Sequence, residues 1–261
     1  MSTIDISELR KVREYTISAV REDVPKVKIY TLSPVNDTIP AFISGQFVNL
    51  HLEVSKTSRD LPAGQTDLDG SEGKKIFRAY SVVSTPGNND IELCIKILDD
   101  GRLSSVLDKK NIGDLVGISG PYGFFKYENQ PNCVFIAAGT GIAPVMGMLR
   151  HIRQNKVNGD FLLMYTNKFE NSIIYHDELK KMNGSSSNVQ IVFTLTQDAS
   201  PHWSGERGRI DREMLARHMA GKSAGDYHYY ICGPLEFIKQ IKDAVVSMGA
   251  KAENIKVEGW G

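Results

Sequence analysis

The pattern of strand and helix signals changes partway along the chain, and this change most constrains the fold. From about residue 15 to residue 119, short segments rich in β-branched and aromatic residues, such as YTISAV, are separated by turn signals. From Cys133 onward, strand-like segments such as CVFIAA alternate with helix-like segments such as PVMGMLRHIRQN. Two patterns in one chain of 261 residues predict two domains.

Each pattern indicates its own architecture. Strands at short spacing favour an antiparallel β-barrel or sandwich, interrupted here by one expected short helix near Leu103 to Lys110. Alternation of strand and helix instead indicates a parallel sheet covered by helices on both faces. The polar segment ENQP places the join near Tyr127 to Pro131.

Composition excludes several classes of function. Lys plus Arg and Asp plus Glu both number 31, so no bulk charge attracts nucleic acid. The three cysteines form no C-x-x-C pair, which argues against a disulfide framework, an iron–sulfur cluster and a metal site. The start MSTIDISELRKV lacks a signal-peptide core, and no apolar run reaches membrane-span length. We therefore expect a cytoplasmic protein without membrane insertion. The polar segment Ser55 to Lys75 is interpreted as a surface loop between barrel strands.

The segment AAGTGIAPVMGML joins a strand to a helix through glycines. Gly139 and Gly141 let the backbone approach a ligand, and Pro144 suits the first turn of a helix. Free amides at a helix N-terminus favour an anion such as pyrophosphate. A tight strand-to-helix turn explains the same residues equally well.

The segment YYICGPLEFIKQI repeats this arrangement later in the chain. A strand ends in Cys232, Gly233 and Pro234, and a helix follows. Ligands of open parallel sheets bind at the carboxyl ends of the strands, where this segment lies. Alone, Cys232 would be a small buried hydrophobe, but its place beside Gly-Pro favours a functional role.

In the barrel half, FRAYSVVSTP has strand alternation that puts Arg78 and Tyr80 on one face. An arginine can bind a phosphate in a bidentate manner, and a tyrosine can stack on a planar ring. An ordinary cross-strand pair is the alternative.

A second anion site is possible in CIKILDDGRLSSVL. Gly101 and Arg102 precede a helix that begins around Ser104. Ser104 is also a good helix N-cap, which is the structural alternative. A tight loop, GPYGFF, follows and closes the barrel.

The order of these motifs is more informative than any one of them. The sequence contains, in order, Arg-x-Tyr-Ser, Gly-x-x-Ser, Gly-Pro-x-Gly-x-Phe, Gly-Thr-Gly-Ile-Ala-Pro, Cys-Gly-Pro and a terminal Glu-x-aromatic. This order resembles the ferredoxin–NADP reductase superfamily of flavoproteins, over residues 15–261.

The resemblance implies a fold, cofactors and a reaction. It implies an FAD-binding antiparallel Greek-key β-barrel in residues 1–128 and an NAD(P)-binding α/β parallel-sheet domain in residues 129–261. It implies an enzyme that transfers hydride between NADPH or NADH and FAD, and single electrons to or from a separate carrier of ferredoxin or flavodoxin type. The alternatives are a flavin-containing subunit of a larger oxidoreductase or oxygenase complex, and a binding module without flavin.

The same resemblance implies roles for individual residues. It places Ser81, Cys232 and Glu258 at the reacting rings, where they position more than they exchange protons. It gives FAD the residues Arg78, Ala79, Tyr80, Ser81, Cys94, Ile95, Lys96, Gly101, Arg102, Leu103 and Ser104. It gives the nicotinamide nucleotide Thr140, Gly141, Lys168, Arg209, Cys232, Gly233 and Pro234, and it places Trp260 on the flavin opposite Tyr80.

Two expectations about the nucleotide stay open. Lys168 and either Arg207 or Arg209 could meet a 2′-phosphate, but TLTQD replaces the Ser-Arg pair of several NADPH-using relatives. A solvated rim would explain these cations as well. Trp260 is interpreted as a movable lid over the flavin, with a buried anchor as the alternative.

Overall fold

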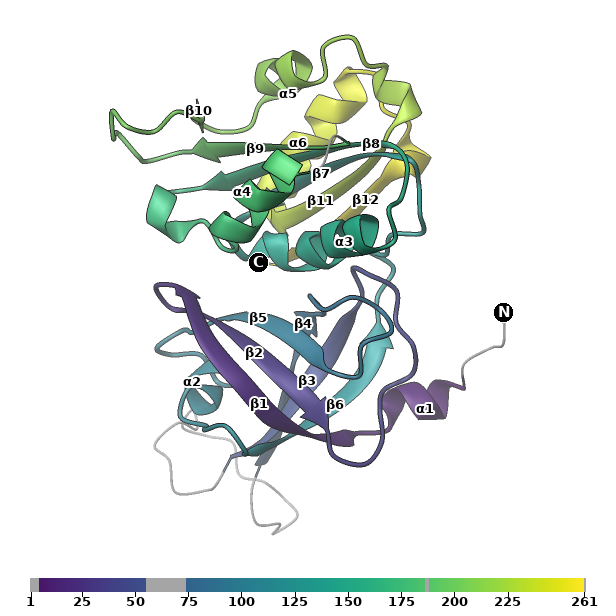
Figure 1. Ribbon diagram of the computed structural model, residues 1–261, viewed down its shortest axis with the longest axis vertical. Helices are drawn as coiled ribbons and strands as arrows, with labels where there is room; N and C mark the ends of the chain where they lie inside the picture. Colours follow the sequence, from purple (N-terminus) through teal and green to yellow (C-terminus); the bar gives the residue numbers. More distant parts are fainter. Residues whose placement is uncertain (1–4, 55–73, 186–187, 261) are drawn as a thin grey trace.

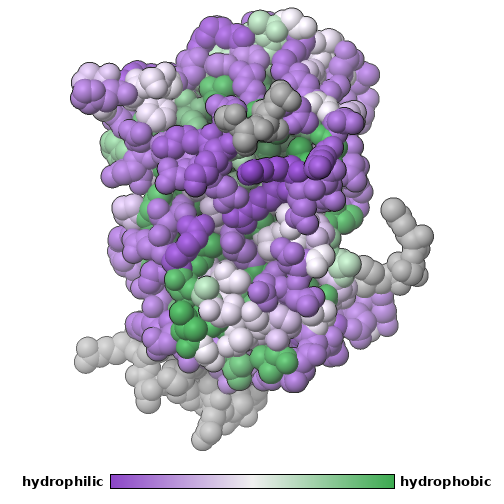
Figure 2. Space-filling model, viewed as in Figure 1, coloured by the Kyte–Doolittle hydropathy of each residue, from purple (hydrophilic) through white to green (hydrophobic). Residues whose placement is uncertain are grey.

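The computed structural model describes residues 5–54, 74–185 and 188–260, and it contains two six-stranded sheets (Figure 1). Of the surface loop expected at Ser55 to Lys75, residues 55–73 lie outside the described residues. Both sheets follow the order in the chain, since the first uses strands up to Tyr122 and the second begins at Asn132. Hydrophilic side chains cover much of the face seen in Figure 2.

The first sheet is antiparallel and closes into a barrel. Its strands are β1 (Arg13–Val24), β2 (Val27–Pro34), β3 (Phe47–Val54), β4 (Lys74–Ser81), β5 (Ile91–Lys96) and β6 (Leu115–Tyr122). Their spatial order is β4-β3-β6-β1-β2-β5, so two hairpins flank β6 in a Greek-key arrangement. A bridge between Val82 and Leu93 joins the two edge strands. The predicted antiparallel Greek-key barrel is therefore confirmed.

The second sheet is parallel, with helices on both faces. Its strands are β7 (Asn132–Ala138), β8 (Asp160–Asn167), β9 (Val189–Leu195), β10 (Glu206–Arg207), β11 (His228–Pro234) and β12 (Ile255–Trp260), in the order β10-β9-β8-β7-β11-β12. The helices are α3 (Ile142–Gln154), α4 (His176–Ser185), α5 (Arg212–His218) and α6 (Leu235–Ser247). The predicted α/β parallel-sheet domain is confirmed.

The helices divide between two apolar layers. One cluster of buried residues contains side chains from α3 and α4, and another contains side chains from α5 and α6. Figure 1 shows α3 between the parallel sheet and the barrel. The cluster around α3 also takes in Val27, Ile29, Val83 and Cys94 from the barrel. The two sheets thus share one apolar core at their junction.

Close contact at this junction depends on a glycine in α3. A Cβ atom on Gly147 would lie 2.9 Å from the carbonyl oxygen of Val82, too close for a real contact. Glycine costs a helix interior about 1 kcal/mol relative to alanine, so its presence here needs a packing reason. That reason is the approach of α3 to the strand end that carries Ser81.

Some local expectations are corrected by the structure. The short helix expected at Leu103 to Lys110 spans only Ser104–Leu107 (α2), and a helix at Ile6–Arg10 (α1) was not predicted. The first half of the GPYGFF segment is not a loop, because β6 continues through Tyr122. No helix in the described ranges is long and apolar enough to cross a membrane.

Candidate functional site

The two edge strands of the barrel separate beyond their single bridge. The Val82 N–H donates to Gln46, on the β3 side, and the Val83 N–H donates to Glu92 of β5. Because main-chain groups alternate along a strand, those of Ala79 and Ser81 face away from β3. Those of Cys94 and Lys96 face β4 by the same alternation. A mouth lined by main-chain donors and acceptors therefore opens between β4 and β5.

The side chains of β4 fit a planar ligand that carries phosphates. Arg78 is exposed and donates a hydrogen bond to the carbonyl oxygen of Phe77, at 2.9 Å. Tyr80 is half-buried against the barrel core, and burial raises its pKa to about 12. The guanidinium can therefore meet an anion while the neutral phenol ring packs on a flat group. Register confirms that these two side chains share a face, since they lie opposite Leu50 and Val48.

The turn before α2 differs in detail from the prediction. Leu103, not Ser104, is the N-cap, and it makes no side-chain cap bond. The Ser104 hydroxyl instead accepts a hydrogen bond from the Leu98 N–H at 3.1 Å. A Cβ on Gly101 would lie 2.2 Å from that hydroxyl, so a larger residue there would displace the Ser104 side chain from this bond. Ser104 thus shapes the turn, while Gly101 and the exposed Arg102 form its outer surface.

Two other predicted contacts on this side have buried side chains. Ile95 and Leu103 both belong to the barrel core, with at most 2% of their surface exposed. Cys94 points the other way and packs in the apolar layer around α3. These three residues can therefore meet a ligand in the mouth only through their main chain.

At the junction of the two sheets, the three predicted catalytic residues come together. The Ser81 hydroxyl donates to Glu258 Oε1 at 3.2 Å across 177 residues of sequence. Cys232 lies opposite Glu258 in the parallel pairing of β11 with β12. The C-terminal strand therefore carries a carboxyl group from the second sheet to the end of β4.

The environment of this group sets its protonation. Burial raises the pKa of Glu258 to about 7, although the hydrogen bond from Ser81 opposes this shift. Burial also raises the pKa of Cys232 well above its ordinary value, and the nearby Glu258 charge adds to the rise. The site thus contains a carboxyl group that titrates near neutrality and a thiol that stays protonated.

Trp260 ends β12 beside this group. It lies opposite Pro234, and 43% of its surface is exposed. A Cβ on Gly141 would lie 3.0 Å from the tip of the indole ring, so the ring lies over Gly141. The same Gly141 could carry no side chain for a second reason, because a Cβ would lie 2.3 Å from the Cys232 carbonyl oxygen.

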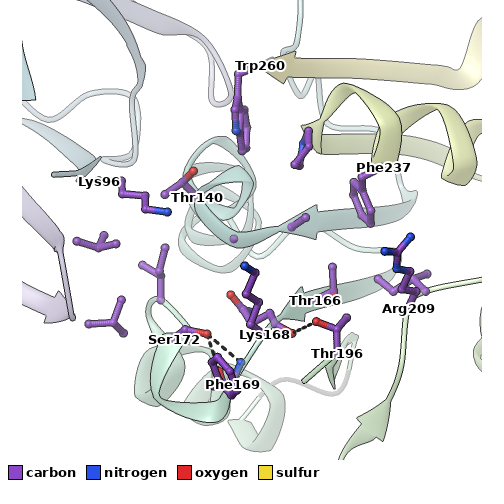
Figure 3. Close-up of a pocket in the computed structure, with 18 of the residues that line it drawn as sticks. Lys96, Thr140, Thr166, Lys168, Phe169, Ser172, Thr196, Arg209, Phe237 and Trp260 are labelled. Atoms are coloured by element: carbon purple, nitrogen blue, oxygen red, sulfur yellow. Dashed lines mark hydrogen bonds between the residues drawn. The ribbon is translucent and has the colours of Figure 1, made fainter. Parts of the chain in front are cut away.

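A cavity of about 560 Å³ opens beside Trp260, at the carboxyl ends of the parallel strands (Figure 3). The predicted residues that line it are Lys96, Thr140, Lys168, Arg209, Pro234 and Trp260. Figure 3 shows Lys96, Lys168 and Arg209 pointing toward it from different sides. The cavity therefore combines a sheet edge, which binds ligands in this class of fold, with three cations.

Two buried polar atoms of residues that line this cavity, the Thr166 hydroxyl and the Asn167 side-chain amide nitrogen, lack a hydrogen-bond partner within the described residues. Thr166 is 8% exposed, and its hydroxyl makes no hydrogen bond within the described part of the chain. Such a group costs about 1–3 kcal/mol unless it is satisfied. A ligand hydroxyl or amide in the cavity would satisfy it. Thr166 was not among the predicted site residues, although its place at the end of the strand FLLMYT is the signal that indicates it.

The two candidate arginines separate in the structure. Arg207 donates to the carbonyl oxygens of Asp198, Ser200 and Trp203, so its guanidinium is committed to the fold of that loop. Arg209 instead lines the cavity. Of the two, Arg209 is therefore the one that can meet an anionic ligand.

The Gly-Thr-Gly turn is a short 3₁₀ helix, not an open loop. It spans Gly139–Gly141 and leads into α3, with Pro144 in the first helical turn as expected. The Tyr165 hydroxyl donates to the Gly139 carbonyl oxygen at 2.9 Å and fixes the turn. Gly233, the remaining predicted residue, lies between Cys232 and Pro234 at the end of β11.

Comparison with known proteins agrees with this geometry. Residues 35–127 match the oxidoreductase FAD-binding domain, and residues 135–243 match the oxidoreductase NAD-binding domain. NADH-cytochrome b5 reductase 1 of Scheffersomyces stipitis is 33% identical over 208 residues, covering 76% of this chain and 72% of that protein. The chain spans 65–72% of the length of three such yeast reductases.

Two ferredoxin–NADP reductases are similar over more of their length. Ferredoxin–NADP reductase B of Sorangium cellulosum is 29% identical over 226 residues, covering 84% of this chain and 85% of that protein. A ferredoxin NADP⁺ reductase from Neisseria gonorrhoeae, solved with bound FAD and NADP, shares the fold with a TM-score of 0.77, at 24% identity, over 95% of this chain and 98% of that one. The strand mouth with its main-chain donors, Arg78 and Tyr80 fits FAD, and the cavity at the parallel strand ends fits a nicotinamide dinucleotide. This chain belongs to the superfamily of oxidoreductases, similar to ferredoxin–NADP reductases, that combine an FAD-binding domain with an NAD-binding domain.

Proposed function

We propose that this oxidoreductase exchanges hydride between NAD(P)H and FAD, and single electrons with a separate protein carrier of ferredoxin or flavodoxin type. Residues 1–128 would form the FAD-binding domain and residues 129–261 the NAD(P)-binding domain. The observation that carries the proposal is the junction itself. There the hydrogen bond from Ser81 to Glu258 joins the end of β4 to the end of β12, beside the nucleotide cavity.

When bound, FAD supplies the exchange between a two-electron hydride and single electrons. The chain's own residues bind and orient the two rings. Arg78 holds the pyrophosphate of FAD, and Tyr80 packs on its flat ring system. Ser81 would lie at the reacting edge of that ring, and its single hydroxyl proton, donated to Glu258 in this structure, becomes available to the ring when a protonated Glu258 donates to Ser81 instead. Reacting atoms must lie about 3–3.5 Å apart, so this orientation is the main contribution of the protein.

The remaining residues control access and proton position. Trp260 covers Gly141 and yields its place to the nicotinamide ring. Cys232 lines the nicotinamide site as a neutral thiol, because burial raises its pKa. Glu258 can hold a proton on its carboxyl group near neutral pH, where the Ser81 hydroxyl is its hydrogen-bond partner. Lys168 and Arg209 lie on the cavity wall where they can meet the phosphates of the nucleotide.

An exposed aromatic residue, Phe124, supports the proposal that the electron carrier is a separate protein. Phe124 is 92% exposed, so its ring is open to a partner, and aromatic side chains are enriched in protein–protein interfaces. It follows Gly123, where a Cβ would lie 3.9 Å from Glu258 Oε2. Phe124 is therefore placed at the rim of the reaction site, where a carrier must dock to receive electrons.

The test compares a protein acceptor with a small one. We expect the FAD-loaded protein to reduce ferricyanide with NADH or NADPH, and to reduce a ferredoxin or flavodoxin as well. Phe124→Ser should raise KM for the carrier about tenfold, as expected for loss of an aromatic anchor, and leave ferricyanide reduction unchanged. Ile112→Ser is the matched control, because Ile112 is 66% exposed but precedes the opposite end of β6.

The acceptors also separate the alternatives. The yeast relatives are named for cytochrome b5, so a b5-type haem protein is the second candidate carrier. Efficient reduction of that haem protein, with none of ferredoxin or flavodoxin, would replace the proposed carrier. Poor reduction of every free carrier, together with co-purifying iron–sulfur subunits, would favour a subunit of a larger complex. Protein that cannot be loaded with FAD would contradict the proposal as a whole.

A further inference from the structure

A cluster of charged and aromatic side chains connects the two sheets, and its own members do not line the nucleotide cavity. None of its members belongs to the cofactor or nucleotide sites described above. We name it the junction clasp, and its members are Arg21, Asp23 and Glu92 from the barrel, and Arg150, Tyr175 and Glu178 from the second sheet and its helices.

Tyr175 is at the centre of the clasp. It is 3% exposed, its N–H donates to Asp23 Oδ2 at 2.7 Å, and its hydroxyl donates to Glu92 Oε1 at 3.0 Å. Its φ is +57°, in the left-handed region that costs a non-glycine residue about 1–3 kcal/mol. Such a conformation persists only where its surroundings over-determine it, and here two bonds from the barrel and one from the Leu179 N–H of α4 hold it.

Arg150 connects three parts of the molecule. Its Nη1 donates to Glu92 Oε1 at 2.8 Å and to the Val83 carbonyl oxygen at 3.3 Å, both in the barrel. Its Nε and Nη2 donate to the two carboxylate oxygens of Glu178 in α4, each at 2.8 Å. Arg150 is thus a bidentate partner of one helix and a direct partner of the barrel, and its side chain is only 19% exposed.

Cation–π contacts add a second link across the same junction. The guanidinium carbon of Arg150 lies 5.2 Å from the centre of the Tyr175 ring, and that of Arg21 lies 5.5 Å from it. The ion pair of Arg21 with Asp23 fixes the barrel side of this arrangement. One arginine comes from each sheet's domain, so the ring is held by cations from both.

Tyr175 and Arg150 of the clasp keep their protons around neutral pH. Burial raises the pKa of Tyr175 well above its ordinary value, so its hydroxyl keeps its proton. Burial alone would lower the pKa of Arg150, but its bonds to Glu178 and the charge of Glu92 raise the pKa above its ordinary value. These two residues therefore keep the same protonation states across neutral pH, and they do not form a pH switch.

The same backbone segments carry the clasp and the reaction site. Val83 is two residues beyond Ser81, and Glu92 is two residues before Cys94 on β5. We propose that Arg150 and Tyr175 are positioning residues for hydride transfer: through Val83 and Glu92, the junction clasp fixes the NAD(P)-binding domain against the barrel and so sets the alignment of nicotinamide with flavin. This inference rests on the FAD and NAD(P)H reaction and not on the identity of the carrier.

A small displacement of the domains should affect the rate of hydride transfer and the affinity for the nucleotide to different extents. A misplacement of about 1 Å between reacting rings can lower a rate about 100-fold, while the binding of the nucleotide's phosphates and adenosine is unaffected. Loss of the clasp should therefore lower the rate of hydride transfer much more than it weakens nucleotide binding.

The test measures the relative position of the domains directly in the FAD-loaded protein. Spin labels at Ser18→Cys on β1 and Ser247→Cys on α6 report the distance between the domains, since both positions are exposed and the three native cysteines are buried. The variants are Arg150→Met and Tyr175→Phe, which keeps the ring between the arginines. The matched control is Arg153→Met, an exposed arginine on the same helix.

We expect one narrow distance distribution in the wild type and in Arg153→Met, and a shifted or broadened one in Arg150→Met. In stopped-flow experiments, hydride transfer should slow at least about tenfold in Arg150→Met, with a smaller loss in Tyr175→Phe, and the nucleotide Kd should stay within about threefold. If Arg150→Met does not fold, Tyr175→Phe, Glu92→Gln and their double variant carry the test, and their effects on rate should be non-additive.

Three results would overturn the proposal. They are an unchanged distance distribution, a hydride-transfer rate within about twofold of Arg153→Met, or a loss that appears only in nucleotide Kd. The distance measurement needs no turnover, so it tests the clasp even if the proposed carrier is wrong. Failure with every protein carrier, together with a clasp effect on hydride transfer from NAD(P)H, would contradict the proposed function alone.

Discussion

The junction between the two domains has two sides that are built in opposite ways. At the reaction site, the hydrogen bond of 3.2 Å between Ser81 and Glu258 spans the domains beside the exposed Trp260. Lys256, on the same face of β12 as Glu258, adds a bond of 2.8 Å to the Lys126 carbonyl oxygen. At the junction clasp, charged hydrogen bonds, cation–π contacts and a strained buried tyrosine span them. The difference separates two tasks: one side keeps the domains fixed, and the other stays free to exchange one ring for another.

The largest effect is expected from Glu258→Gln, which changes the reaction-site side of the junction. Loss of the ionisable group should lower kcat about 100-fold, in the range for loss of one positioned proton-holding group. Burial raises the pKa of Glu258 to about 7, so the wild-type pH profile of kcat/KM should bend near pH 7, and the variant profile should lose that bend. An unchanged bend would assign it to another group.

The same substitution should change how stability depends on pH. A carboxyl whose folded pKa lies above its unfolded value stabilises the fold fully below the unfolded pKa, and this contribution is lost as pH rises from about 4.5 to about 7. Denaturant unfolding of FAD-free protein should therefore show stability falling over that window in the wild type and a flatter curve in Glu258→Gln. A steeper curve in the variant would contradict the raised pKa.

Gly147→Ala tests the close packing of α3 against the barrel without removing a charge. The new methyl group would meet the Val82 carbonyl oxygen at 2.9 Å, so α3 must move away from the barrel. We expect a loss of about 1–3 kcal/mol in the free energy of unfolding, although alanine favours the helix itself. A calorimetric scan measures the loss, and a stabilised variant would show that α3 approaches the barrel less closely.

Deleting Trp260 and Gly261 tests whether the Trp260 ring at the reaction site is free to move. Because the ring is 43% exposed and lies over Gly141, we expect a change of about tenfold in nucleotide Kd with little loss of stability. Fluorescence titration and thermal unfolding measure the two quantities. Loss of FAD or unfolding of the truncated protein would mean that Trp260 is an anchor and not a lid.

The smallest effect is expected from the cations of the cavity. Lys168→Ala and Arg209→Ala should each weaken the binding of NADPH several-fold and the binding of NADH less, because a 2′-phosphate adds charge that these side chains can meet. Arg207→Ala is the control, since its guanidinium is committed to main-chain carbonyl groups. Equal losses with both nucleotides would make the two cations partners of the shared pyrophosphate.

Sequence patterns predicted most of the fold because they are local. Alternation identified the barrel strands, and glycines at strand ends located the cavity edge, which the parallel sheet then assembled. Local reasoning failed where a residue had two equivalent uses. Ser104 fits a helix cap by type, yet its hydroxyl closes the turn onto Leu98.

The clasp escaped prediction for a different reason. Its contacts join residues far apart in sequence, such as Asp23 with Tyr175, separated by 152 residues. Nothing in the residue types pairs one arginine with one glutamate among 31 basic and 31 acidic residues. Nor does a tyrosine signal a positive φ. Only the three-dimensional arrangement identifies these six residues as one unit.

The pairing of β12 with β11 determines which side chains at the end of the chain face the reaction site. Lys256, Glu258 and Trp260 alternate onto one face of β12, while Ile255 packs with the core on the other side of the sheet and a Cβ on Gly259 would meet Ile238 there. A single-residue insertion or deletion within this strand would exchange the two faces. The carboxyl group and the aromatic cover would then leave the reaction site together, so an in-frame insertion or deletion of one codon within β12 would remove both from the reaction site at once.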